Sequence, residues 1–204
     1  MTQSEALLIL KPIVEHLSDG LDAGDWQAFE AQITVQVFDT GDILLEANQI
    51  YGSFWFIARG LIRNFYITED GKEFNKAFLP APGFCGAMSE WVGGKASRYS
   101  IQAMMPVIAL RIPMDWMRVV IHERPAFARL LVALLSELAW RKERREAAFL
   151  LDDATCRYQQ CVRELEGLAE HIPAYQLASY LGITEVALSR IKRRLREQRA
   201  FPFQ

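Results

Sequence analysis

The residues best suited to chemistry are the cations near the C-terminal end of the chain. Six lysine and arginine residues lie between Arg190 and Arg199, where the only acid is Glu197. A guanidinium group can donate two hydrogen bonds to the O6 and N7 atoms of guanine, and any cation can pair with a DNA phosphate. The whole chain has a formal net charge of −2. A local basic stripe on such a protein favours DNA binding at selected sequences over indiscriminate binding.

Two short helices within residues 173–195 must position these cations. One apolar stripe joins them, and its members are Leu177, Ala178, Leu181, Leu188, Ile191 and Leu195. Gly182 stands where the chain must turn, because glycine tolerates the positive φ of such a turn. Thr184 can cap the second helix. The pattern predicts a helix-turn-helix, and the alternative is a pair of core helices with a solvated charged face.

The outer face of the second helix, predicted over residues 184–196, carries the candidate DNA contacts. We assign base reading first to Arg190. The second choices are Ser189, Glu185 and Val186, since glutamate can accept a hydrogen bond from cytosine and valine can contact a thymine methyl group. Contacts to phosphates, which position a protein without reading sequence, are assigned to Tyr175, Lys192, Arg193 and Thr184.

In residues 33–112, short β-rich runs alternate with glycine-containing turns. The runs are ITVQVF (33–38), DILLE (42–46), FWFI (54–57), LIRNFYI (61–67), KEFNKAF (72–78), SIQAM (100–104) and VIALRI (107–112), and a loop is expected between Gly83 and Ser100. Asp70-Gly71 separates two such runs and is a hairpin signal, and Gly60 is expected to adopt a φ that a side chain would forbid. Runs of this length at nearly regular intervals predict an antiparallel barrel or sandwich. Before them, residues 4–17 and 25–31 are predicted to form short helices.

A long helix is predicted from Pro125 to about Phe149. Its main apolar repeat is formed by Phe127, Leu131, Leu134 and Leu138, and further apolar residues occupy other sides. A helix that is apolar nearly all round is buried on more than one face. We assign this repeat to a dimer helix, and we expect one face of the helix to pack on the β region and the other on a second copy, as a short parallel coiled coil. The alternative is a helix packed wholly within one subunit.

Several function classes find no support in the sequence. The first residues lack the basic segment of a signal peptide, and no apolar run is long enough to span a bilayer, so we expect a cytoplasmic protein without membrane contact. The three cysteines form no CxxC pair, and the three histidines (His16, His122 and His171) are dispersed outside the predicted strands. We therefore predict no metal site and no enzyme.

The order of these elements resembles the CRP/FNR family of bacterial transcription regulators. The resemblance covers nearly the whole chain and is most specific over FWFIARGLIRNFYITEDGKE (54–73) and LASYLGITEVALSRIKRRL (177–195). It implies an α+β fold with a β-roll sensor domain of the cyclic-nucleotide-binding type over 1–120, a dimerisation helix over 121–150 and a helix-turn-helix domain over 151–204. It also implies a homodimer on a near-palindromic double-stranded DNA site, contact with RNA polymerase, and base reading by Arg190.

The effector pocket departs from the family pattern. Cyclic-nucleotide binders of this family carry Gly-Glu-Leu, whose glutamate binds the ribose, and then an arginine that binds the cyclic phosphate. This chain has Gly86-Ala87-Met88 and Ser97-Arg98 at the corresponding places. The carboxylate is absent and the arginine is displaced by one residue, which on a strand turns the side chain to the opposite face. We therefore predict no tight cyclic AMP binding, unless Arg98 reaches the phosphate from a loop.

Two further expectations follow from the resemblance. Three scattered cysteines cannot supply the four thiolates of an iron–sulfur sensor, so no cofactor is predicted and the effector is left open. The alternative to a DNA-binding regulator is a small-molecule sensor or signalling adaptor whose C-terminal helices bind protein.

Overall fold

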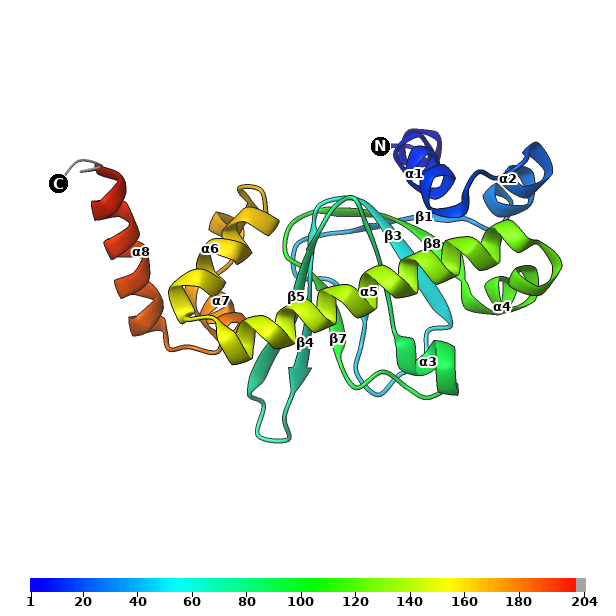
Figure 1. Cartoon of the computed structure of the whole chain (residues 1–204). Coiled ribbons are helices and arrows are strands. Elements are labelled where there is room, and N and C mark those ends of the chain that lie inside the picture. Colours follow the sequence, from blue (N-terminus) through cyan, green and yellow to red (C-terminus); the bar gives the residue numbers. More distant parts are fainter. Residues whose placement is uncertain (201–204) are drawn as a thin grey trace.

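The structure is a computed structural model that describes residues 1–200, with side chains for residues 1–198. Two N-terminal helices precede a β-roll, a long helix crosses the roll, and the C-terminal helices follow (Figure 1). The helices are α1 (Gln3–Ser18), α2 (Ala23–Glu30), α3 (Met88–Gly93), α4 (Met114–Glu123), α5 (Pro125–Leu151), α6 (Ala154–Glu164), α7 (Ala174–Leu181) and α8 (Glu185–Ala200), with a 3₁₀ turn at Leu168–His171. The predicted α+β class is confirmed.

The roll consists of two antiparallel four-stranded sheets. The strands are β1 (Thr34–Phe38), β2 (Ile43–Leu45), β3 (Ser53–Arg59), β4 (Leu61–Ile67), β5 (Glu73–Pro80), β6 (Gly83–Gly86), β7 (Ser100–Ala103) and β8 (Val107–Pro113). One sheet has the order β1-β8-β3-β6 and the other β2-β7-β4-β5. Seven of these strands match predicted runs, whereas β6 and α3 fall in a region that the sequence analysis treated as loop.

Gly60, between β3 and β4, fulfils its predicted role. Its φ is +108°, and a Cβ atom there would lie 2.6 Å from the carbonyl oxygen of Pro106. Both the backbone conformation and the close approach therefore exclude a side chain. The tight turn lets β3 and β4 belong to different sheets although only one residue separates them.

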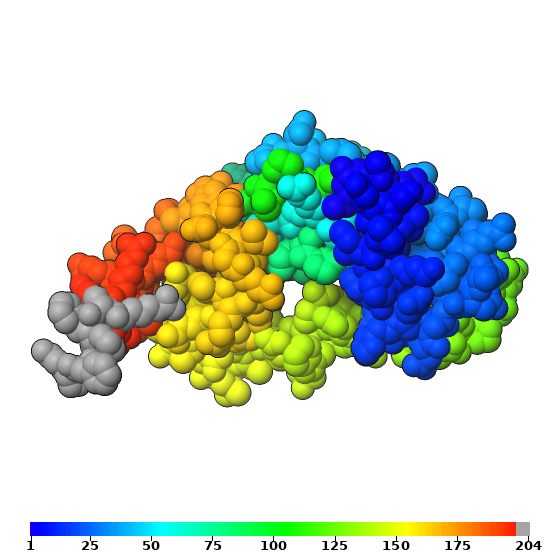
Figure 2. Space-filling view, turned by 90° about the horizontal axis from the view of Figure 1, so that it is seen from above, coloured from blue at the N-terminus to red at the C-terminus, as the bar shows by residue number. Residues whose placement is uncertain are grey.

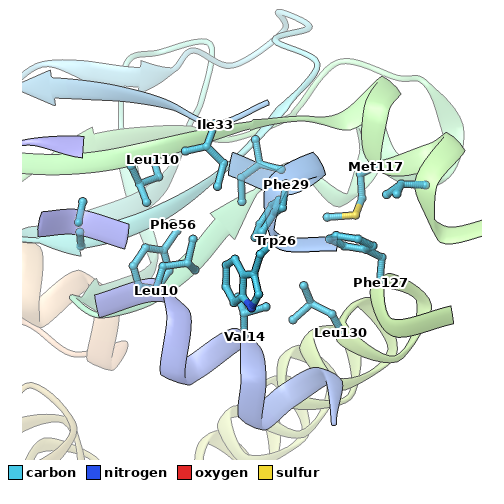
Figure 3. Packing of buried hydrophobic residues seen from close by; sticks show 14 residues of the cluster. Leu10, Val14, Trp26, Phe29, Ile33, Phe56, Leu110, Met117, Phe127 and Leu130 are labelled. Atoms are coloured by element: carbon cyan, nitrogen blue, oxygen red, sulfur yellow. The ribbon is translucent and has the colours of Figure 1, made fainter. Parts of the chain in front are cut away.

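The first core lies between the roll, the N-terminal helices and the start of α5 (Figure 3). Phe127 is fully buried there, and its ring lies 5.5 Å from that of Phe29 and 5.2 Å from that of Trp116. Phe127 therefore cannot contact a second copy in this conformation, which corrects its assignment to the dimer face. Packing with α2 and α4 takes up this side of the helix within one subunit.

A second core joins the C-terminal helices to the roll. Leu61 and Phe78 from β4 and β5 pack in one cluster with residues of α6, α7 and α8. Asp153 caps α6 by accepting hydrogen bonds from the backbone N–H groups of Thr155 and Cys156, both at 2.8 Å. The helices of this region are therefore ordered by their own caps and by burial against the second sheet.

Within residues 1–200, no helix combines the length and the apolar character needed to cross a membrane. Among the same residues, histidine, cysteine, aspartate and glutamate side chains do not gather in groups of three that could hold a metal ion.

Candidate functional site

Helices α7 and α8 form a tight pair of the predicted kind. Gly182 ends α7 with a φ of +68°, and its backbone N–H donates to the carbonyl oxygens of Ala178 and Ser179. Thr184 then accepts a hydrogen bond from the backbone N–H of Ala187 at 3.2 Å, as the capping prediction requires. The stripe predicted to join the helices is buried at Leu177, Ala178, Leu181, Leu188 and Ile191, and half-buried at Leu195.

The four residues assigned to base reading all lie exposed on α8. Glu185, Val186, Ser189 and Arg190 are solvent-accessible, and Val186 is 62% exposed although it is apolar. Helical periodicity places Val186, Ser189 and Arg190 on the side opposite the buried stripe and Glu185 at the flank of that side. The face can therefore meet a large partner without rearrangement of α8.

The residues assigned to phosphates are more varied in their surroundings. Arg193 is exposed, and its Nε atom lies 3.8 Å from Oε1 of Glu197. This surface ion pair is weak, so a phosphate could replace Glu197 as the partner of Arg193. Lys192 is half-buried, with its ammonium group 6.0 Å from the ring of Tyr158. Tyr175 is 55% exposed at the start of α7, and Thr184 is exposed immediately before α8. Arg199, counted in the basic cluster, has its side chain outside the described residues.

Contacts that the sequence analysis missed fix α7 to α5 and to β5. The guanidinium of Arg145 lies 3.9 Å from the ring of Tyr180 and donates a hydrogen bond to the Tyr180 carbonyl oxygen at 3.0 Å. On the other side, the Asn75 backbone N–H donates to Ser179 Oγ at 3.1 Å, and Asn75 Nδ2 donates to the Gln176 carbonyl oxygen at 3.2 Å. Such contacts join segments far apart in sequence, so no local pattern signals them.

A cavity of about 1310 Å³ lies between the roll and α5, and Figure 2 shows this hollow from above. Helix α5 contributes four leucines, Leu131, Leu134, Leu135 and Leu138, and also charged residues, among them Glu137, Lys142 and Glu146. The roll side carries the polar side chains of Asn64, Tyr66, Lys76, Arg98 and Tyr99, together with Gly86 and Met88. Three members of the predicted dimer repeat thus line the cavity.

The predicted effector residues are only partly at this cavity. Gly86, Met88 and Arg98 line it, and Arg98 is exposed. Ala87 is fully buried and lies outside the lining. The hydroxyl of Ser97 donates to the carbonyl oxygen of Tyr99 at 2.7 Å, so it stabilises the loop. The Tyr99 side chain, two residues further along, occupies the wall instead.

Lys76 is the cavity residue that the sequence analysis overlooked. Across β4 and β5, Asn64 pairs with Ala77 and Phe65 pairs with Asn75, so Lys76 is the extra residue of a β-bulge. Its ammonium group lies 3.6 Å from the ring centroid of Tyr99. Burial, with a smaller effect of Lys142, lowers the pKa of Lys76 to about 8. A lysine in the middle of a strand was the available signal, but the bulge was not readable from the sequence.

The cavity lining combines charged groups, among them Glu137, Lys142, Glu146 and Glu164, with neutral groups of the roll. Burial raises the pKa of the Cys85 thiol to about 12, and burial also raises the pKa of Tyr99 above its usual range. The hydroxyl of Tyr99 donates to the Gly86 carbonyl oxygen at 2.7 Å. Within residues 1–198, no carboxylate forms an ion pair with Lys76. The cavity therefore offers a partly desolvated cation without a counter-ion from the protein.

Comparisons with known proteins agree with this architecture. Residues 35–124 match the cyclic nucleotide-binding domain family. A search of curated proteins found no match to the sequence.

Among solved structures, FixK2 from Bradyrhizobium japonicum is 16% identical, with a TM-score of 0.72 over 81% of this chain and 85% of that chain. The c-di-GMP-responsive regulator CLP from Xanthomonas campestris is also 16% identical, with a TM-score of 0.67 over 87% of this chain and 93% of its own. A CRP/FNR-family protein from Eubacterium rectale is 14% identical, with a TM-score of 0.69 over 87% and 85% of the two chains. At these identities, the likeness concerns the fold.

Proposed function

We propose that this chain, whose fold is that of the CRP/FNR transcription regulators, is a sequence-specific DNA-binding regulator that acts as a homodimer and is not controlled by cyclic AMP. The observation that carries the proposal is the outer face of α8. It presents Glu185, Ser189 and Arg190 to solvent, next to a glycine turn and a buried apolar stripe. This is the arrangement in which a second helix enters the major groove.

The basic character of α8 supports DNA as the partner. Arg190, Arg193 and Arg194 line a shallow hollow on the helix surface, where the only acid is Glu197. Arg190 suits guanine, because its guanidinium group can donate two hydrogen bonds to the O6 and N7 acceptors. Such a bidentate contact favours guanine over the wrong base by about 1–3 kcal/mol of binding free energy. In a two-fold dimer, two such helices would meet successive major grooves about 34 Å apart.

The exposed side of α5 supports the homodimer. Val132, Ser136, Ala139 and Glu143 are exposed and follow one another at spacings of four, three and four residues. That spacing is the seam of a coiled coil, and the small side chains permit two helices to approach closely. We therefore place the dimer contact on this stripe, next to Leu131, Leu134 and Leu138, which line the cavity.

The cavity chemistry supports control by something other than cyclic AMP. The position expected to supply a ribose-binding carboxylate is Ala87, which is fully buried and apolar. Arg98 is exposed at the rim of the cavity, and Tyr99 fills the adjacent wall. A cyclic nucleotide would thus lose a hydrogen-bond acceptor for its ribose and the buried arginine that would pair with its phosphate through two hydrogen bonds.

Selection from a random duplex pool, followed by gel shifts, tests the proposed function. The wild-type protein should enrich a near-palindromic sequence, because each copy of α8 reads one half-site. Arg190→Ala should relax the preference at one base pair per half-site, since only the guanine-reading group is lost.

Arg193→Ala is the matched control on the same helix. It should weaken binding to all duplexes alike and lower the salt slope by about one unit per lost phosphate contact. No enrichment by the wild type, or an Arg190→Ala profile identical to that of the wild type, would contradict DNA reading by α8. A protein target for the C-terminal helices would then become the better hypothesis.

A further inference from the structure

We propose that the cavity between the roll and α5 binds a small organic anion with a flat apolar body, and that Lys76 and Asn64 hold its polar end. The ligand class is an aromatic or similarly planar molecule that carries a carboxylate, sulfonate or phosphate beside a hydrogen-bond donor. That this ligand acts as the effector rests on the proposed regulator function, whereas its binding to the cavity does not.

The polar end of the site is defined by two unsatisfied groups. Lys76 brings an ammonium group into the cavity without a carboxylate partner among residues 1–198. Asn64, on the paired strand, is 6% exposed, and its Oδ1 atom has no hydrogen-bond partner among the described residues. A buried polar atom without a partner destabilises a protein, so such atoms in native proteins call for an explanation. An anion with a neighbouring N–H or O–H group would satisfy both.

The β-bulge shows why Lys76 is available. Its neighbours Asn75 and Ala77 take the paired positions opposite Phe65 and Asn64, and the extra residue carries the cation. Bulges re-aim side chains and are common beside functional sites. A surface lysine would need no such device. Here the β-bulge turns the ammonium group of Lys76 towards the cavity, where burial disfavours its charge.

The apolar end of the site is supplied by α5 and by aromatic rings of the roll. Leu131, Leu134 and Leu138 form one wall of the cavity. Tyr66 and Tyr99 form part of the other, and their rings meet edge-on with centroids 6.0 Å apart. A planar body fits between an aliphatic and an aromatic wall, and binding pockets typically combine such walls with a few polar groups.

The site differs from the one that the family resemblance implies. There, an arginine following the roll's pocket loop binds the anion. In this chain the anchor is a lysine on β5, with Lys142 of α5 as the next cation that acts on it electrostatically. The anion is therefore expected nearer to the β4–β5 hairpin and to α7, which β5 contacts through Asn75.

The test uses 8-anilinonaphthalene-1-sulfonate, which combines a sulfonate, an N–H group and aromatic rings. Fluorescence titration of the full chain without DNA measures its affinity, and N-phenyl-1-naphthylamine serves as the neutral analogue. Lys76→Met should weaken sulfonate binding about tenfold or more, because a charge-assisted contact is lost. Binding of the neutral analogue should change less than threefold, which also shows that the variant retains its cavity.

Lys72→Met is the matched control, since Lys72 is exposed on the same hairpin and outside the cavity lining. It should leave both affinities unchanged, and Lys76→Arg should restore most of the sulfonate affinity. Competition with 1-naphthoate and 1-naphthyl phosphate distinguishes a carboxylate from a phosphate ligand. An equal effect of Lys76→Met on both probes, an effect of Lys72→Met as large as that of Lys76→Met, or displacement by neither competitor would overturn the proposal. Because no DNA is present, these outcomes are independent of whether the protein reads DNA.

Discussion

At the scale of single residues, Lys76 is the group whose surroundings are least usual. Its ammonium group lies 3.6 Å from the ring centroid of Tyr99, and the cation Lys142 acts on it electrostatically. Burial removes water from the ammonium group, and the cation–π contact compensates only in part. The protonated form of Lys76 is therefore less stable than that of a solvent-exposed lysine, and a bound anion would stabilise it.

The lowered pKa of Lys76 predicts that anion binding depends on pH. The pKa of Lys76 is lowered to about 8, so the free protein loses this charge as the pH rises through about 8. Affinity for 8-anilinonaphthalene-1-sulfonate should therefore be constant below about pH 7 and fall by up to tenfold per pH unit above about pH 8. Cys85 and Tyr99 stay neutral over this interval, because burial raises the pKa of each.

Fluorescence titrations between about pH 6 and pH 9.5 measure the effect, since the sulfonate is ionised throughout. The Lys76→Met variant should show a flat profile. A wild-type profile that is also flat, or a fall of equal size in the variant, would show that another group controls the binding.

At the scale of elements, the junction between α7 and α8 depends on Gly182. Its φ is +68°, and a Cβ atom there would lie 2.8 Å from Cε1 of Phe149 on α5. The Phe149 ring is flanked by the guanidinium groups of Arg145 and Arg157, at 4.8 and 5.1 Å. A side chain at Gly182 would therefore strain the turn and also displace this ring.

Gly182→Ala is expected to lower the free energy of unfolding by about 1–2 kcal/mol from backbone strain alone, with a further loss from the contact with Phe149. Gly167→Ala is the control, because Gly167 has a φ of +90° but open space around it. Urea unfolding should show the larger loss for Gly182→Ala, and a double-mutant cycle with Phe149→Ala should remove the difference. Equal losses for the two glycine variants would contradict the steric part of the argument.

The elements also show which features a sequence can predict. Helices α7 and α8 were predictable because Gly182, Thr184 and an apolar stripe act within one short segment. Strand β6 and helix α3 were missed because four and six residues are too few to show a period. Lys76 was missed for another reason. Its bulge depends on the pairing of β5 with β4, and the cavity depends on how α5 crosses the roll. Phe127 was misassigned because periodicity does not tell which of two partners an apolar face meets.

At the scale of the whole molecule, the exposed stripe of α5 is the proposed dimer contact. Val132 is 62% exposed and lies in that stripe, so Val132→Lys would bring two like charges together across a two-fold helix pair. We expect the variant to sediment as a monomer at about 10 μM, where the wild type sediments as a dimer, and to lose affinity for a two-half-site duplex.

Val92→Lys provides the control, because Val92 is 79% exposed on α3, away from α5. It should leave the sedimentation coefficient unchanged. If Val132→Lys sediments as the wild type does, the dimer contact must lie on another surface.

The bulge in β5 has one more consequence, which follows from its two adjacent residues. Lys76 faces the cavity, while Asn75, one peptide bond away, is hydrogen-bonded to α7. If an anion bound at Lys76 shifts these hydrogen bonds, it will change the affinity of the protein for a duplex, and the duplex will then change the affinity for the anion by the same factor. Allosteric communication between the cavity and the C-terminal helices would then pass through a single strand, β5.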